Sequence, residues 1–395
     1  MQRAPGTLVV GGGIGGLTVA SALFRRGVDV RVVEQAKHFE PVGAGITIQA
    51  NAAAVLRALG IELPGADVLP IGGVEVLGER GRTLMRANAA EILQDPPSVT
   101  IHRADLHRAL LSACKDVPLE AGVRVASVLP DAQGVDVVFD DARRERFGWV
   151  IGADGIRSAL RQALTGESDA DLRYSGQTCW RFAVEAPDLV PRIPTERWMP
   201  GRRIGMVPIA GGRVYVYLVE SAARGTPGPG TSTPDTLRAR FGGVDPRLDG
   251  LLERLNGSVP IDHSDLLDRT RISFGAGRVV LIGDAAHPMT PNLGQGACMA
   301  IEDVGALALL LREHAADPST LPQAIDALRR SRVASVQRAS WRIGQVSHWS
   351  NPVACSLRNA LLRVTPDSAS SRQARQLWQP GVELAAQLRA SAPFL

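Results

Sequence analysis

The chain has 395 residues, of which 45% are hydrophobic and 21% charged, and this balance excludes a disordered chain, a collagen and a small disulfide scaffold. At roughly 150 residues per domain, the length predicts two or three domains or one large intertwined fold. The net charge is only +4, and 42 of the 44 basic residues are arginines that alternate with acids, so nucleic acid is not the expected partner.

The cysteines favour a reducing cytoplasm. No C-x-x-C pair or neighbouring histidine pair accompanies them, so we expect no metal site and no disulfide framework. The uncharged stretch from Ala4 to Phe24 is long enough to span a membrane, but six glycines exclude a membrane helix there. The four cysteines are Cys114, Cys179, Cys298 and Cys355.

The first part of the chain predicts a strand, a glycine turn, a helix and a second strand. The strands cover Thr7 to Val10 and Val28 to Val33, and the helix runs to about Arg26. Further on we predict helices from Ala52 to Leu59 and from Arg103 to Cys114, and strands from Val99 to His102 and from Trp149 to Ile151, the latter following a polar turn from Asp140 to Arg146.

The second part changes character. From Tyr174 to Glu220 the pattern is antiparallel and rich in aromatic residues. The apolar run from Gly277 to Gly283 is typical of a parallel strand covered on both faces. A helix from about Gln295 to Glu313 follows, and the remainder is helical.

The glycine turn carries the pattern G-x-G-x-x-G. Between a strand and a helix, the first glycine makes the turn, the second lets the backbone approach a pyrophosphate, and the third lets the helix pack on the strand. Glu34 lies 18 residues after Gly16, where a carboxylate accepts hydrogen bonds from the ribose of an adenosine. We therefore predict that a dinucleotide is bound by Gly11, Gly13, Ile14, Gly15, Gly16 and Glu34.

Two later motifs also follow strands, namely Gly152-Ala153-Asp154-Gly155 with Arg157 and Gly283-Asp284-Ala285-Ala286-His287-Pro288. With the fingerprint, they resemble the motifs of the class A FAD-dependent aromatic monooxygenases, the family of para-hydroxybenzoate hydroxylase, over almost the whole chain. The resemblance implies that Asp284 binds the ribityl chain of FAD and that Asp154 and Arg157 couple FAD binding to nicotinamide binding. It also implies that Arg103, in His-Arg-x-x-Leu, contacts the flavin.

A third flavin element is the turn from Pro291 to Gly296, which opens an apolar helix. A helix N-terminus carries an equivalent charge of about +0.5, which stabilises negative charge near N1 and O2 of a reduced flavin. We therefore expect Pro291, Gly294 and Gly296 at the edge of the flavin ring.

The resemblance implies a single-component FAD monooxygenase. Such an enzyme uses NADH or NADPH and O2 to hydroxylate or epoxidise a small aromatic, heteroaromatic or quinone-like ring through a flavin C4a-hydroperoxide. Shelter from water is then the main contribution of the protein. Because no second complete glycine fingerprint occurs, we expect the nicotinamide cofactor to bind transiently.

The expected fold class is α/β: a discontinuous, Rossmann-like FAD-binding domain with an inserted mixed β-sheet substrate domain and C-terminal helices. We assign residues 1–70, 97–172 and 270–330 to the FAD-binding domain. Residues 71–96 and 173–269 are assigned to the substrate domain, and residues 331–395 to the C-terminal helices.

On the substrate side, Arg203 and Tyr215 lie twelve residues apart. The stretch that contains them resembles the FAD-dependent urate hydroxylase branch, where an arginine and a tyrosine at this spacing line the substrate pocket. The resemblance implies that Arg203 holds an anionic or enol-type oxygen and that Tyr215 positions or deprotonates the substrate. The alternative is a surface arginine beside a tyrosine that serves only strand propensity.

Other functions stay open at this point: a flavin-dependent halogenase or reductase of the same fold, or a non-catalytic flavin-binding protein. Halogenation is disfavoured, since no lysine follows Lys115 and the W-x-W-x-I-P signature is absent. The Arg-rich amphipathic helix from Ser356 to Val364 leaves room for a lipophilic substrate, as in the aurachin-type quinolone hydroxylases, and for weak peripheral membrane contact. A purine-like substrate is the alternative, and both a monomer and a homodimer remain open.

Overall fold

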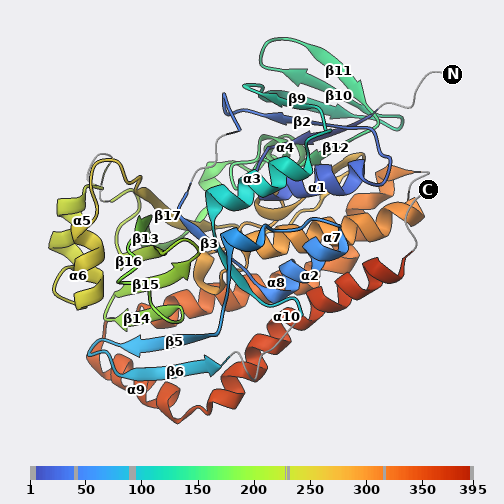
Figure 1. The fold of residues 1–395 in the computed structure, drawn as a ribbon. Helices are drawn as coiled ribbons and strands as arrows, with labels where there is room; N and C mark the ends of the chain where they lie inside the picture. Colours follow the sequence, from blue (N-terminus) through green and yellow to red (C-terminus); the bar gives the residue numbers. More distant parts are fainter. Residues whose placement is uncertain are drawn as a thin grey trace.

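The computed structural model describes residues 6–39, 43–88, 95–226, 228, 232–314 and 317–391. It is a mixed α/β fold with C-terminal helices, as expected (Figure 1). Two large sheets organise it, and two three-stranded sheets flank them.

The first sheet has the order β18-β19-β12-β1-β2-β8, and each neighbouring pair except β18-β19 is parallel. Every residue of β1, β12 and β19 is buried, as expected of strands inside a parallel sheet. The strands are β1 (Thr7–Val10), β2 (Val30–Glu34), β8 (Leu119–Ala121), β12 (Trp149–Gly152), β18 (Gly275–Ala276) and β19 (Val279–Leu281).

This parallel sheet places the predicted motifs together. β1 ends before Gly11, β2 ends at Glu34, β12 leads to Asp154, and β19 leads to Asp284. Because parallel strands end at the same edge, all four motifs lie along the carboxyl edge of one sheet, where open α/β sheets bind their ligands.

The second large sheet has the order β17-β13-β16-β15-β14-β5-β6, in which only β14 and β5 are parallel. Two distant stretches of the chain therefore share it; the division into domains by residue range stays a prediction. The strands are β5 (Gly73–Gly78), β6 (Thr83–Asn88), β13 (Arg173–Glu185), β14 (Thr195–Met199), β15 (Arg202–Ile209), β16 (Arg213–Ser221) and β17 (Asp262–Asp268).

The two faces of this seven-stranded sheet differ because side chains alternate along each strand. Trp180 and Phe182 on β13 are fully buried in a separate apolar core with Leu237 and Phe241 of α5 (Pro234–Phe241). In Figure 1, α5 and α6 (Pro246–Glu253) lie beside this sheet, away from the parallel one. Residues of the opposite register, such as Gln177, face α8 (Leu321–Ser347).

One small sheet corrects a boundary. The predicted polar turn from Asp140 to Arg146 is shorter, since strand β11 already begins at Arg144 (Arg144–Phe147) and pairs with β10 (Val135–Phe139). This edge strand can contain charged residues because one side of it is exposed, and there Arg146 forms ion pairs with Asp131 and Asp136. The other small-sheet strands are β9 (Val125–Pro130), β3 (Gly45–Ile48), β4 (Val68–Pro70) and β7 (Val99–His102).

Apart from α5, α6 and α9, the helices pack around the parallel sheet in one continuous apolar core. α10 runs along α2 and reaches α7 (Figure 1). The predicted helices are present. Most ends shift by one or two residues, but α9 begins at Pro352, four residues before the predicted Ser356, because Asn351 caps it. Their bounds are α1 (Ile14–Phe24), α2 (Ala50–Ala58), α3 (Arg103–Ala113), α4 (Ala159–Thr165), α7 (Gly296–His314), α9 (Pro352–Val364) and α10 (Asp367–Ala390).

Candidate flavin and substrate site

The glycine fingerprint is a tight turn that accepts no side chain at its ends. Gly11 has φ 107°, and a Cβ there would lie 2.4 Å from the carbonyl oxygen of Ala153. A Cβ on Gly16 would lie 1.8 Å from the carbonyl oxygen of Gly11. A Cβ on Gly13, by contrast, would meet nothing within 4 Å, so the middle glycine faces open space. This is the division of roles that a pyrophosphate turn requires.

Glu34 lies directly over this turn. Its Oε2 accepts a 2.6 Å hydrogen bond from the N–H of Gly12, and its Oε1 accepts a 2.8 Å bond from the N–H of Ala36. Each carboxylate oxygen has two acceptor positions, so capacity remains for two ribose hydroxyls.

Asp154 follows β12 and contacts the same region. Its Oδ2 accepts from the N–H groups of Ala159 and Leu160 and so caps α4, whereas its buried Oδ1 has no hydrogen-bond partner among the described residues. Desolvation raises the pKa of this carboxyl. The structure does not bring Arg157 to it: Arg157 forms a surface ion pair with Asp169 at 2.9 Å.

A residue with an unanticipated role, Arg161, connects two of the motifs. It is 1% exposed and donates from Nη1 to the carbonyl oxygens of Ala285 and Ala286 at 3.1 and 2.6 Å. Its Nε pairs with Glu167 at 2.8 Å. Arg161 therefore fixes the backbone immediately after Asp284.

Asp284, Gly296 and Arg103 converge from three elements. A Cβ on Gly296 would lie 3.9 Å from Oδ1 of Asp284, so the carboxylate faces the N-terminus of α7. Asp284 is exposed to solvent. Desolvation by the surrounding protein nevertheless raises the pKa of its carboxyl, and this effect outweighs the charges of His287 and Arg103, which act to lower that pKa. Gly43 makes room for Arg103, because a Cβ at Gly43 would lie 2.8 Å from Cδ of Arg103.

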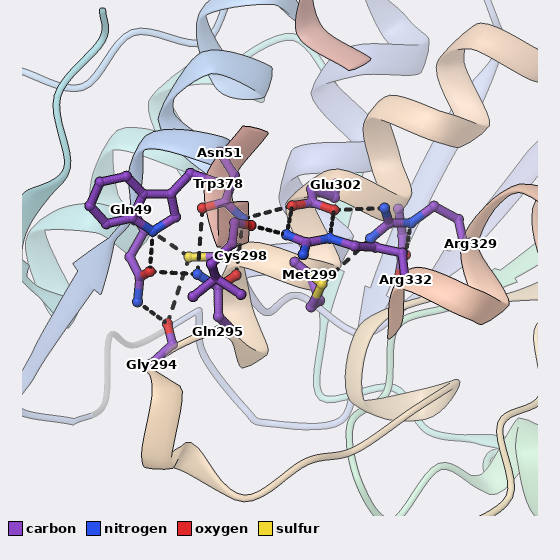
Figure 2. Close-up of polar contacts among 12 residues, drawn as sticks. Gln49, Asn51, Gly294, Gln295, Cys298, Met299, Glu302, Arg329, Arg332 and Trp378 are labelled. Atoms are coloured by element: carbon purple, nitrogen blue, oxygen red, sulfur yellow. Dashed lines mark hydrogen bonds and ion pairs between the residues drawn. The ribbon is translucent and has the colours of Figure 1, made fainter. Parts of the chain in front are cut away.

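Side-chain amides form hydrogen bonds that fix the turn from Pro291 to Gly296 (Figure 2). Gln49 donates to the carbonyl oxygen of Leu293 at 2.7 Å, and its own Oε1 accepts from Gln295 and from the indole of Trp378, each at 2.6 Å. Gly294 and Pro291 are both exposed, and Gly294 adopts φ 63°. The network leaves the predicted ring-edge residues Pro291, Gly294 and Gly296 free on the open side, with Trp378 of α10 as an anchor.

Buried charges support the same helix. Asp303 accepts from His287 at 2.5 Å and from the N–H of Gly283 at 3.0 Å, and Arg329 donates to its other oxygen at 2.9 Å. Although desolvation acts to raise it, the pKa of Asp303 is lowered by the charges of His287 and Arg329. Through its bond to Asp303, His287 orders the loop that carries Asp284. Figure 2 shows the neighbouring ion pair between Glu302 and Arg329.

Arg203, on the seven-stranded sheet, reaches the turn that precedes α7. It is 2% exposed, and its Nη2 donates to Oδ1 of Asn292 at 2.5 Å. Its Nη1 lies 3.3 Å from Oε1 of Glu196 on β14. Its Nε is buried without a partner among the described residues. The surface-arginine alternative is therefore wrong.

Tyr215 shares the face of Arg203 but does not touch it. Arg203 is opposite Val219 in the ladder and Tyr215 is opposite Val207, with Tyr217 between them. The Tyr215 ring packs on Gly45, where a Cβ would lie 2.4 Å away. Desolvation raises the pKa of Tyr215 to about 12, so the phenol is a donor and not a base at neutral pH.

Sequence reasoning missed Glu196 and Tyr217 on this face. The hydroxyl of Tyr217 donates to Oε2 of Glu196 at 2.5 Å, and the indole of Trp198 donates to Oε1 at 2.5 Å. Tyr217 could have been predicted, because residues two apart on a strand lie on the same face, and Tyr217 is two residues after Tyr215. Glu196 was not, because only the pairing of β14 with β15 brings it to Arg203.

A cavity of about 430 Å³ lies where β13, the end of β16 and the end of α8 meet. Gln177 and His348 line it, and Oε1 of Gln177 is 3.5 Å from Nη2 of Arg203. Desolvation and the charge of Arg203 lower the pKa of His348 to about 2, so its imidazole is neutral. Trp180 lies on the opposite face of the sheet, in the apolar core with α5.

The chain matches a known protein family over most of its length. A family model described as an FAD binding domain matches residues 6–340. The chain is 38% identical to aurachin C monooxygenase/isomerase from Stigmatella aurantiaca, over 95% of this chain and 99% of the relative. It belongs to this flavin monooxygenase family. The monooxygenase is also 33% identical to the 2-heptyl-3-hydroxy-4(1H)-quinolone synthase of Pseudomonas aeruginosa, over 96% and 99% of the two chains.

A solved structure gives the same result for the fold. Klebsiella pneumoniae HpxO, crystallised with FAD and uric acid, superposes with a TM-score of 0.86 at 26% identity and covers 96% of this monooxygenase and 98% of its own chain. The cofactor of the monooxygenase is FAD, and NAD(P)H is the reductant. Among the residues that the model describes, no group of side chains could hold a metal ion, and no helix is long and apolar enough to cross a membrane.

The described residues fit FAD. The open Gly13 turn suits the pyrophosphate, Glu34 retains acceptor capacity for the ribose, and Asp284 faces the start of α7. The unpartnered Oδ1 of Asp154 is a further acceptor along the same edge. The individual assignments remain predictions that substitutions can test.

Proposed function

We propose that this monooxygenase hydroxylates an uncharged, carbonyl-bearing nitrogen heteroaromatic ring of the 4(1H)-quinolone kind. The observation that carries the proposal is the state of Arg203, whose Nε is buried and unpartnered while its Nη1 already faces Glu196. A free donor in a buried site seeks an acceptor. A carboxylate substrate, however, would also meet the charge of Glu196, so a neutral carbonyl oxygen is favoured over a benzoate.

The chain's own residues then have defined tasks. Arg203 would donate to the ring carbonyl, with Asn292 and Glu196 fixing its guanidinium. Tyr215 would donate from its protonated hydroxyl and would not remove a proton, because its pKa is about 12. When bound, FAD supplies the two-electron chemistry that takes electrons from NAD(P)H and activates O2 for transfer of one oxygen atom to the ring.

Two relatives support the quinolone over a purine. The chain is 33% identical to an enzyme named for a 2-heptyl-3-hydroxy-4(1H)-quinolone product, but 28% identical to a urate hydroxylase from Mycolicibacterium vanbaalenii. The four cysteines are free and buried, which supports the cytoplasm as the location within this proposal.

The test compares three ring compounds with the purified FAD-loaded protein: 2-heptyl-4(1H)-quinolone, urate and 3-amino-4-hydroxybenzoate. We expect the quinolone to stimulate NADH oxidation and to gain one oxygen atom by mass spectrometry, and the two anions to do neither. Hydroxylation of urate or of the benzoate without hydroxylation of the quinolone would overturn the proposal.

A further inference from the structure

The helix α9 carries an exposed apolar stripe that the fold leaves uncovered. Among the described residues, nine large apolar side chains are exposed, and five of them fall within the 16 residues from 349 to 364. The stripe consists of Trp349 (40% exposed), Val353 (77%), Leu357 (60%), Leu361 (58%) and Val364 (75%). Such clustering is uncommon on soluble surfaces and marks a contact site.

Four members of the stripe lie on one side of α9, and Trp349 precedes the helix. Val353, Leu357, Leu361 and Val364 recur every three or four residues, so at about 100° per residue they fall within an arc of about 80°. The opposite side of α9 is occupied: Cys355 and Arg358 are buried, and Arg358 donates from Nη1 to the carbonyl oxygens of Val346 and Ser347 at 3.1 and 3.0 Å. α9 is therefore anchored by one side and presents the other outward.

The charges beside the stripe select its partner. Residues 349–366 contain no aspartate or glutamate and two arginines, of which Arg358 is buried and Arg363 is exposed. At about 100° per residue, Arg363 lies about 80° around the helix from Val353, on the exposed side of α9. A second copy of this helix face would offer Arg363 no carboxylate from α9, whereas anionic lipid headgroups complement it.

We propose that α9 docks this enzyme peripherally on an anionic membrane surface, with the apolar stripe entering the headgroup region and Arg363 contacting lipid phosphate. No described helix can span a bilayer, so the contact lies in the interface. The placement of Trp349 at the start of the stripe agrees with the preference of tryptophan for that interface.

The position of the stripe gives the contact a use, which rests on the proposed function. Trp349, Ala354 and Gln177 all line the 430 Å³ cavity, and Oε1 of Gln177 lies 3.5 Å from Nη2 of Arg203. A lipophilic ring compound dissolved in the bilayer would thus meet the cavity from the membrane side. The substrate class is accordingly an alkyl-bearing heteroaromatic that partitions into lipid.

The docking is tested with the FAD-loaded, full-length protein and vesicles, without substrate. We expect sedimentation with phosphatidylglycerol vesicles, and weaker sedimentation with phosphatidylcholine vesicles. Leu357→Glu should lower the partition coefficient at least about tenfold, because a charge replaces a leucine that enters the headgroup region. Arg363→Glu should weaken binding to phosphatidylglycerol only.

The matched control is Leu129→Glu, which places the same charge at a 62% exposed leucine on β9. We expect it to bind vesicles like the parent. No binding by the parent, or equal binding by the Leu357→Glu and parent proteins, would overturn the proposal. Light scattering that shows a dimer dissociated by Leu357→Glu, with no vesicle binding, would assign the stripe to a second copy instead.

This experiment is independent of the proposed reaction. Stimulation of NADH oxidation by 2-heptyl-4(1H)-quinolone in a vesicle-free, detergent-containing assay tests the substrate class alone. Vesicle binding without turnover would contradict the quinolone as substrate but support membrane docking by α9. Turnover without vesicle binding would support the quinolone as substrate but contradict membrane docking.

Discussion

Nη2 of Arg203 lies 2.5 Å from Oδ1 of Asn292, so the seven-stranded sheet is joined to the loop before α7 by one hydrogen bond. Asn292 is held in this orientation because its Nδ2 donates to Thr290 Oγ1 at 3.0 Å and to the carbonyl oxygen of Ser340 at 2.9 Å. A substrate oxygen bound by Arg203 would therefore lie where the seven-stranded sheet meets the turn from Pro291 to Gly296.

Replacing Arg203 should uncouple the enzyme. In Arg203→Met, Glu196 keeps its bonds to Tyr217 and Trp198, so we expect the fold and the visible FAD spectrum to persist. Loss of one charged hydrogen bond is worth roughly 1.5 to 3 kcal/mol, or about 10- to 150-fold in substrate affinity. The ratio of hydroxylated product to NADH consumed should fall, with peroxide rising.

The control for this variant is Arg202→Met, one residue earlier, whose guanidinium bonds to the carbonyl oxygen of Arg240. It should keep the parental ratio of product to NADH. A parental ratio in both variants would remove Arg203 from the substrate site.

Tyr215 should act as a donor over the whole working pH range. A phenol with pKa about 12 is protonated below that pH and titrates only above it, so product formation from pH 6 to 10 should show no step attributable to Tyr215. Tyr215→Phe should lower product formation by a similar factor at every pH, measured with FAD occupancy. Tyr174→Phe, on the same sheet and bonded to the carbonyl oxygen of Ala222, is the control. An alkaline step that disappears in Tyr215→Phe would show that the tyrosine is a base.

Asp284→Ala should lower FAD occupancy and turnover together, because the carboxylate that faces the start of α7 is removed. Occupancy is measured as the ratio of flavin absorbance to protein absorbance after gel filtration. Asp169→Ala, which removes only a surface ion pair with Arg157, should keep its flavin. Full occupancy in Asp284→Ala with altered substrate binding would mean that the motif is misassigned.

Trp378 should influence the flavin from a distance. Trp378→Phe removes the indole bond to Gln49 Oε1, whose other donor is Gln295 of the flavin loop. One neutral hydrogen bond is worth about 1 kcal/mol, so we expect FAD affinity to fall about fivefold in a titration, with the melting temperature little changed. Trp349→Phe, which leaves this network intact, should bind FAD like the parent.

The motifs at the carboxyl edge of the parallel sheet were predictable from sequence because each is local. Gly11 to Gly16 and Asp284 follow strands and Glu34 ends one, the apolar residues of each strand are contiguous in the chain, and parallel pairing brings the strand ends together. The strand Thr7–Val10 and the strand Val99–His102 also agree with the structure to the residue.

The substrate side was less predictable because its contacts are not local. Asn292 meets Arg203 across 89 residues, and Glu196 reaches it only through the pairing of two antiparallel strands. In the pairing of β15 with β16, Tyr217 lies between Arg203 and Tyr215 on one face of the sheet. That register depends on the turn between the two strands, and a spacing of twelve residues does not specify the turn. Likewise, the outward direction of Leu357 and Leu361 depends on how α9 is anchored.

One reaction tests most directly whether this enzyme hydroxylates a 4(1H)-quinolone with an oxygen atom from dioxygen. The purified FAD-loaded enzyme is mixed with NADH and 2-heptyl-4(1H)-quinolone under isotopically labelled dioxygen, and the product is analysed by mass spectrometry. We predict a quinolone that has gained one labelled oxygen atom, formed in near-equal amount to the NADH consumed. An unlabelled product, or NADH oxidation that yields only peroxide, would contradict the account.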